Sequence, residues 1–347
     1  MKVLLTIALL ITSWPMQVAG QRQKQLDVSA DFAKRSPPPV SAEARRELEA
    51  KLSEARIRYE AQPKNPDAVI WFGRRLAYLG RFTEAIEAYS SGIKQFPRDA
   101  RLYRHRGHRY ITLRKFDLAI ADLQKAVTLI KGLPAEVEPD GQPNARNIPT
   151  GTLQFNIWYH LGLAQYLTGR NEDALKSYRE CLKVSGNPDS IVATTHWLYM
   201  TLRRLKRESE ARQALEPVQP KMDVIENDGY YKLVLMYKGL ADAEALLAET
   251  LKQPSSPGSL SILYGLANWH HYNGRIEKSV ELLQQIVSSD QWTSFGYIAA
   301  ETDLKRAQIS LLLECRGMCS ATHFDCLLTY QSKAAAASLS ITQMVRT

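Results

Sequence analysis

The chain has 347 residues, of which 45% are hydrophobic and 23% are charged, and its formal net charge is +9. This is the composition of an ordinary globular protein, and the length suits two average domains or one long repeat array. The positive charges are spread along the chain without a Lys/Arg-rich run, so the sequence favours acidic partners and does not indicate a nucleic-acid-binding protein.

Residues 1–20 have the pattern of a secretory signal peptide. Lys2 precedes the apolar run Val3–Ile11, and small residues end the segment at Gly20. A basic start, a short apolar core and a small-residue end are typical of a cleaved leader, and the run is too short to span a bilayer comfortably. We therefore expect cleavage after Gly20 and export, either to the periplasm or by secretion. An uncleaved N-terminal membrane anchor is the alternative.

Residues 21–40 are expected to form a flexible linker, because they are polar and end in the stiff segment Pro37–Pro39. A helix is predicted next, over residues 41–62, with Ser41 as its N-cap. Its single apolar stripe is formed by Leu48, Leu52, Ala55 and Tyr59. A helix with one polar face suits the end of a repeat array, where it covers the terminal repeat.

The segment that follows contains one pattern written twice, 34 residues apart. Gly73, Phe82, Ala85 and Ile86 recur as Gly107, Phe116, Ala119 and Ile120. Self-similarity at this period indicates stacked helix pairs. Because Gly inside a helix costs about 1 kcal/mol relative to Ala, Gly73 and Gly107 are predicted to lie where a second helix crosses too closely for a Cβ. Gly80 lies in the turn of the first copy, and Arg114 takes its place in the second.

These two copies resemble the tetratricopeptide repeat family. The matching residues are Phe72, Gly73, Leu76, Gly80, Phe82, Ala85, Tyr89, Gly92 and Pro97, then Gly107, Tyr110, Phe116, Ala119, Leu123 and Ala126. The resemblance implies an all-α protein, a right-handed α-solenoid of about six helix-turn-helix repeats over residues 63–306. It also implies that the chain binds a protein or peptide.

Residues 132–154 interrupt the repeats with four prolines and three glycines. Long loops inside compact domains are usually functional or disordered. This loop mixes polar residues with Ile148 and is followed by Phe155, so we expect an ordered loop folded over one face of the solenoid rather than a passive spacer. Its candidate binding residues are Asp140, Asn144, Arg146 and Asn147.

The pattern resumes clearly at Trp158 and Gly162, weakens in the fourth and fifth copies, and recovers around Gly274 before a half-repeat over residues 294–306. Residues 307–347 form a divergent tail that does not match the repeat. The tail contains Cys315, Cys319, Cys326 and His323. This spacing lacks the paired knuckles of a strong zinc motif, so a metal site, a disulfide and an unspecialised tail all stay open.

In the family that this chain resembles, the first helix of each repeat lines a concave groove. Counting from each repeat's Gly position, the resemblance places the following candidate binding residues in that groove: Arg74, Arg101, Arg104, His105, His108, Asn156, Tyr159, His160, His196, Arg203, Asn268, His271 and Tyr272. Such a groove is basic and aromatic with hardly any acids, so an acidic or C-terminal peptide segment is the expected partner. The carboxylate clamp of the chaperone-binding members needs Lys and Asn where this chain has Ile70 and Arg74, so that partner class is not expected.

Common catalytic motifs, namely the P-loop, G-x-S-x-G, H-E-x-x-H and G-x-G-x-x-G, do not occur in the sequence. We therefore expect no enzyme activity, no cofactor and no bound metal. The predicted function is a non-enzymatic scaffold that binds a protein or peptide outside the cytoplasm. The alternatives are a membrane-tethered assembly subunit, held by an uncleaved N-terminus, and a metal-dependent hydrolase that uses the groove histidines.

Overall fold

The computed structural model describes residue 32 and residues 35–318, with side chains through residue 307. The expected signal peptide, most of the expected linker, and the tail residues Cys319, His323 and Cys326 lie outside the described residues. Only the backbone is described at Cys315. Contacts divide the chain into one unit over residues 1–36 and another over residues 37–347. In the first unit, the Arg35 guanidinium lies 6.0 Å from the centre of the Phe32 ring.

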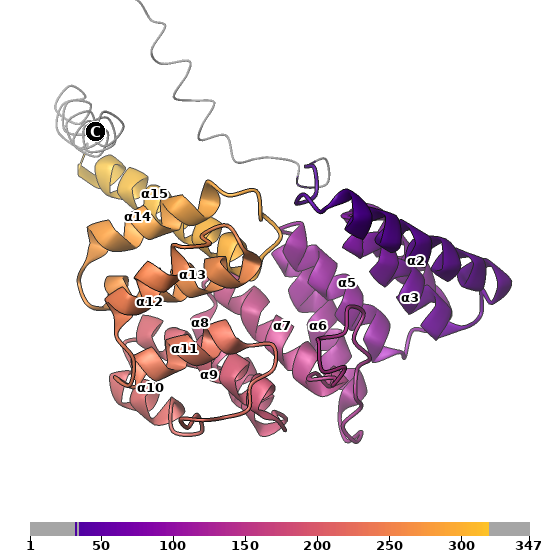
Figure 1. The fold of residues 1–347 in the computed structure, drawn as a ribbon, viewed down its shortest axis with the longest axis horizontal. Helices are drawn as coiled ribbons and strands as arrows, with labels where there is room; N and C mark the ends of the chain where they lie inside the picture. Colours follow the sequence, from indigo (N-terminus) through magenta and orange to yellow (C-terminus); the bar gives the residue numbers. More distant parts are fainter. Residues whose placement is uncertain (1–31, 33–34, 319–347) are drawn as a thin grey trace, which may run out of the picture. The chain divides into compact units, whose positions relative to one another are not determined.

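In its described part, residues 37–318, the second unit is built from helices, with one isolated antiparallel bridge between Val137 and Thr152. The helices are α2 (Ala42–Ala61), α3 (Pro66–Tyr78), α4 (Phe82–Gln95), α5 (Ala100–Thr112), α6 (Phe116–Ile130), α7 (Leu153–Leu167), α8 (Asn171–Lys183), α9 (Pro188–Arg204), α10 (Glu208–Ala214), α11 (Asp228–Tyr237), α12 (Ala243–Thr250), α13 (Pro257–Tyr272), α14 (Ile276–Val287) and α15 (Phe295–Met318). From α3 to α14 the helices follow one another as six consecutive pairs, and five of these pairs pack together directly (Figure 1). The exception is the fifth pair, in which α11 packs on α9 and α13 and α12 packs on α13. The prediction of an all-α repeat solenoid is confirmed. No helix within the described residues is both long and apolar enough to cross a membrane.

The turn inside each helix pair has one residue in the left-handed conformation. These residues are Gly80, Arg114, Gly169, Lys206, Gly239 and Gly274, with φ between 59° and 77°. Glycine is the usual choice at such a position because a Cβ is strained there. Arg114 and Lys206 are the two exceptions, and the side-chain contacts of Arg114 are described below.

Close helix crossings explain the glycines inside the first helices. A Cβ on Gly73 would lie 2.4 Å from a ring carbon of Tyr89, and one on Gly107 would lie 2.9 Å from Leu123 Cγ. Both distances are too short for a carbon–carbon contact, which confirms the crossing predicted from the period. Gly162 repeats the arrangement against Tyr178, at 2.8 Å.

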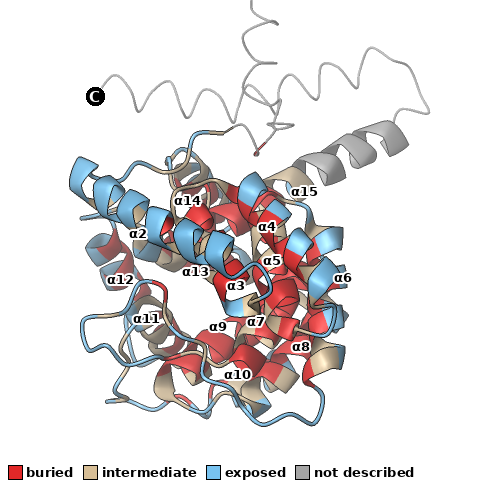
Figure 2. Ribbon diagram, turned by 90° about the vertical axis from the view of Figure 1, so that its right-hand side faces the viewer, coloured by how far each residue is buried: buried red, intermediate tan, exposed pale blue. Residues whose placement is uncertain are grey.

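The two ends of the array differ in how they are covered. Helix α2 packs on α3 with Leu52 as its buried residue, and most of its surface is exposed (Figure 2). The predicted helix over residues 41–62 corresponds to α2. At the other end α15 packs against α13 and α14, and it continues to Met318, beyond the expected boundary at residue 306.

The C-terminal segment also returns to the first repeats. Arg114 Nε donates to Glu301 Oε2 on α15 at 2.8 Å, and Arg114 Nη2 donates to the carbonyl oxygen of Trp292 at 2.8 Å. The Trp292 ring meets the Phe82 ring edge-on at 5.7 Å between centroids. Because the late repeats pack onto the early ones, the inward side of the array is largely a protein interior rather than an open groove.

Candidate functional site

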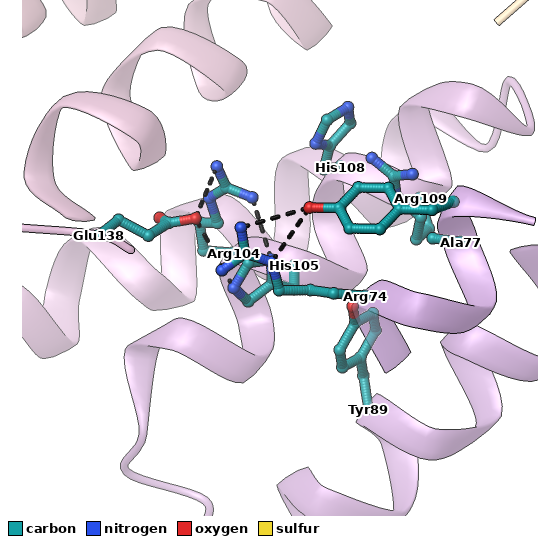
Figure 3. Close-up of a pocket in the computed structure, with 9 residues that line it drawn as sticks. Arg74, Ala77, Tyr89, Arg104, His105, His108, Arg109 and Glu138 are labelled. Carbon is teal, nitrogen blue, oxygen red and sulfur yellow. Dashed lines mark hydrogen bonds and ion pairs between the residues drawn. The ribbon is translucent and has the colours of Figure 1, made fainter. Parts of the chain in front are cut away.

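A polar pocket of about 130 Å³ lies on the inward side of the first two repeats (Figure 3). Its lining residues come from α3, α4, α5 and the loop over residues 132–154. They are Arg74, Ala77, Tyr78, Tyr89, Arg104, His105, His108, Arg109 and Glu138. Residues four apart on a helix share a face, which is why α3 presents Arg74 beside Tyr78 and α5 presents both Arg104 beside His108 and His105 beside Arg109.

Glu138 brings the loop's carboxylate into this pocket. Its Oε1 lies 3.0 Å from Arg104 Nη2, and both side chains are about nine-tenths buried. Its other oxygen accepts a hydrogen bond of 3.1 Å from Asn156 Nδ2 on α7. An ion pair removed from water holds its partners in place only where the remaining polar atoms are also satisfied, and Asn156 provides that second contact.

His105 and His108 are neutral in the folded protein. Arg104 Nη1 lies 3.0 Å from His105 Nδ1, and because a guanidinium only donates, that nitrogen accepts and the ring proton sits on Nε2, 3.7 Å from Glu138. Burial, and then the charge of Arg104, hold the pKa of His105 well below its usual value. Burial, and then the charge of Arg109, do the same for the pKa of His108.

The His108 ring also lies 4.4 Å from the His160 ring on α7. Burial holds the pKa of His160 well below its usual value, and its Nδ1 donates to the carbonyl oxygen of Asn156 at 2.5 Å. Phe295 of α15 covers both rings, at 5.4 Å and 5.7 Å between centroids. His160 is therefore part of the packed interior, and the partly buried His108 lies between it and the pocket.

The loop's backbone is held by two arginines of α3. Arg74 Nη1 donates to the carbonyl oxygen of Pro139 at 2.8 Å, and Arg75 Nη1 donates to that of Gly141 at 2.9 Å. Gly141 comes so close to Tyr78 that a Cβ there would lie 1.8 Å from the Tyr78 hydroxyl. The segment from Glu138 to Gly141 thus lies across α3 and α5. These helices bind it through the Glu138 carboxylate and through the carbonyl oxygens of Pro139 and Gly141.

The predicted loop residues lie further along the same segment. Asn144 Nδ2 donates to Glu226, Arg146 Nη1 pairs with Asp223, both at 2.7 Å, and Asn147 adopts φ 52° in a turn closed onto the Asn144 carbonyl. Partial burial, and then the charge of Glu226, raise the pKa of Asp140. The loop is therefore anchored at both ends, on α3 and on the connection before α11.

The other predicted groove residues lie away from the pocket, and three of them, His196, Asn268 and Tyr159, are buried. His196 is fully buried and stacks on Tyr230 at 4.6 Å between centroids. Asn268 Oδ1 accepts from the Tyr272 hydroxyl at 2.8 Å, and the Arg203 guanidinium lies 5.2 Å from the centre of the Tyr272 ring. Tyr159 is buried and accepts a bond of 2.8 Å from the Trp197 indole. His271 is exposed.

The expectation of a groove with hardly any acids differs from the structure. Arg101 pairs with Asp99 at 2.6 Å and with Asp67 at 2.7 Å, outside the pocket. Arg104 pairs with Glu138, as described above. These carboxylates neutralise much of the predicted basic surface. They were missed because the acids come from helix starts and from the loop, which lie outside the counted inward positions.

The pocket therefore collects Arg74, Arg104, His105 and His108 from the predicted set, with Asn156 and His160 behind them. It adds Arg109 and Tyr89, which the counting did not select, and Glu138, which only the loop's path brings there. Arg109 directly follows a counted position on α5, so a wider count would have found it. Across the described residues, no three His, Cys, Asp or Glu side chains converge as a metal site would require.

Comparison with known proteins identifies the repeats. Residues 71–134 and residues 155–188 each match a family model described as "Tetratricopeptide repeat". The "Small glutamine-rich tetratricopeptide repeat-containing protein 2" of Saccharomyces cerevisiae is 26% identical over 103 residues, which are 30% of this chain and 24% of that protein. The chain thus aligns with about a quarter of that relative's length.

Solved structures with similar folds share little sequence with the chain. "Crystal structure of MamA" is 17% identical, with a TM-score of 0.39 over 50% of this chain and 88% of that one. "Crystal structure of YrrB: a TPR protein with an unusual peptide-binding site" is 14% identical, with a TM-score of 0.38 over 73% of this chain and 97% of that one.

Proposed function

Since this chain is a tetratricopeptide repeat protein, we propose that it acts as a non-enzymatic scaffold that binds an acidic, extended segment of a partner protein. The observation that carries the proposal is the way α3 and α5 hold the chain's own loop. Arg104 takes a carboxylate, and Arg74 and Arg75 take backbone carbonyls, from a stretch of extended chain. Arginine forks suit such groups because they donate two parallel hydrogen bonds.

A matched pair of arginine variants tests this proposal. Binding of immobilised acidic peptides, and of the same peptides with Lys in place of Asp and Glu, is measured by interferometry. The wild type is expected to prefer the acidic set, and Arg74→Gln is expected to weaken that binding about tenfold, roughly 1.4 kcal/mol. Arg101→Gln removes the same charge outside the pocket and is expected to bind like the wild type. Equal binding of both peptide sets, or equal loss in both variants, contradicts the proposal.

We propose further that the protein acts outside the cytoplasm, because residues 1–20 have the composition of a cleaved leader. Mass spectrometry of the mature chain, expressed with its native N-terminus, tests this proposal directly. An N-terminus at Gln21 supports export and cleavage. An intact Met1 in the membrane fraction would instead indicate a tethered protein.

A further inference from the structure

The pocket on α3 and α5 has more positive charge than its own residues neutralise. Three guanidinium groups, those of Arg74, Arg104 and Arg109, face a single carboxylate, that of Glu138. The lowered pKa values of His105 and His108 make both imidazoles neutral, so they neither add to this charge nor offset it. An excess of two positive charges therefore lies in a largely buried space.

Arg109 is the least compensated of these groups. No ion pair joins it to a carboxylate among the described residues, and its guanidinium lies 5.7 Å from the centre of the Phe82 ring. Burial lowers the pKa of Arg109 to about 10, which is the direction expected of a cation that has lost its water. A cation–π contact offsets only part of that loss.

Arg104 supplies a second observation. Its Nη2 binds Glu138 and its Nη1 binds His105, yet its Nε is buried without a hydrogen-bond partner in the described structure. Buried donors are nearly always satisfied in folded proteins, and the exceptions call for a functional explanation. In Figure 3, Glu138 lies at one end of the pocket and Arg109 at the other, so an incoming anion at Arg109 is not forced against the carboxylate.

We propose that this pocket binds a phosphate-type dianion, either free inorganic phosphate or the phosphoryl group of a larger ligand. Two negative charges match the excess, whereas a carboxylate would offset half of it. Guanidinium forks fit the oxygens of phosphate, and the volume of about 130 Å³ accommodates one small oxyanion with water but not a nucleotide. The pocket shares Arg74 and Arg104 with the peptide-binding residues proposed above, but the phosphate proposal rests on Arg109, which that binding does not use.

Calorimetric titration of the full-length protein with sodium phosphate, at constant ionic strength, measures the binding. We expect saturable binding, with acetate at least tenfold weaker. Arg109→Gln is expected to weaken phosphate binding at least tenfold while raising the melting temperature of the phosphate-free protein, because it removes a partly buried charge that no carboxylate offsets. Arg179→Gln removes an exposed arginine that pairs with Glu210 and is expected to bind phosphate like the wild type.

Glu138→Gln provides an independent test, because this variant is expected to bind phosphate more tightly, whereas Arg109→Gln is expected to bind it more weakly. Loss of the only carboxylate in the pocket raises the positive excess, so phosphate binding is expected to become severalfold tighter. Titration with a phosphoserine peptide distinguishes the two possible ligands. If the peptide binds more tightly than inorganic phosphate, the ligand is a phosphorylated side chain; if it binds equally or more weakly, the ligand is free phosphate. Non-saturable binding that acetate reproduces, unchanged binding by Arg109→Gln, or weaker binding by Glu138→Gln would each overturn the proposal.

Discussion

Replacement of Arg114 by Gly is expected to destabilise the protein, although Gly is the residue that four of the six equivalent turns use. Arg114 has φ 59°, a left-handed conformation. For a residue with a Cβ this conformation costs about 1–2 kcal/mol, and Gly would relieve it at an entropic cost of about 0.5–1 kcal/mol. Local conformation alone therefore predicts a small gain, of at most about 1.5 kcal/mol in the free energy of unfolding.

The tertiary contacts of Arg114 outweigh that gain. Its guanidinium donates to Glu301 and to the Trp292 carbonyl, and the Arg114 and Glu301 side chains are only 8% and 6% exposed. Lys305 lies 3.5 Å from the other Glu301 oxygen but is itself 38% exposed. Breaking a buried ion pair from one side costs about 3–5 kcal/mol, so Arg114→Gly is expected to lower the free energy of unfolding by about 1.5–5 kcal/mol.

Urea unfolding, followed by circular dichroism and by tryptophan fluorescence, measures this difference. Lys206→Gly is the matched control, because Lys206 has the same φ of 59° in an exposed turn. That variant is expected to be as stable as the wild type or up to about 1.5 kcal/mol more stable. Addition of Glu301→Gln to Arg114→Gly should restore part of the loss, because it removes a buried charge that keeps only the half-exposed Lys305 as a partner. Equal stability of Arg114→Gly and the wild type would refute the reasoning.

Two further predictions concern the packed interior. Gly73→Ala places a Cβ 2.4 Å from the Tyr89 ring. The overpacking cost of about 1–3 kcal/mol should exceed the gain in helix propensity of about 1 kcal/mol, so a lower melting temperature is expected. The control Gly186→Ala, whose new Cβ meets no atom within 4 Å, should melt at the same temperature as the wild type. Burial lowers the pKa of His196 to about 3. Between pH 6.5 and 3, the His196 imidazole is therefore protonated in the unfolded chain and not in the folded protein. The free energy of unfolding consequently falls as the pH drops through that window, by up to about 1.4 kcal/mol per pH unit. His196→Leu should flatten the pH dependence of the urea midpoint there, exposed His271→Leu should not, and an unchanged slope in both would contradict this assignment.

Local patterns were enough to predict the helix pairs. The period of 34 residues, the glycines at the close crossings and the glycines in four of the six turns all depend on sterics within one helix pair. Gly73 illustrates this, because the cost of a helical glycine predicted a crossing that the structure places against Tyr89. The all-α solenoid followed from the same repeated pattern.

The site depended on contacts between distant parts of the chain. The inward position of Arg74, Arg104 and His108 followed from counting along each helix, but the path of the loop that brings Glu138 to Arg104 did not. The loop's prolines and glycines mark a break in the repeats, and they carry no information about which helices it crosses. The sequence therefore predicted a basic surface where the structure has a partly neutralised pocket.

The sequence by itself determined the repeating unit and which helix faces point inward, because both follow from side-chain periodicity and from backbone sterics over a few turns. Only the tertiary structure decided that α15 returns to the first repeats through Arg114 and Glu301, 187 residues apart, and that the loop enters the inward side. Small rotations between successive helix pairs add up along the array, and their sum sets whether its ends meet. That sum depends on the packing of every pair, which no single repeat encodes.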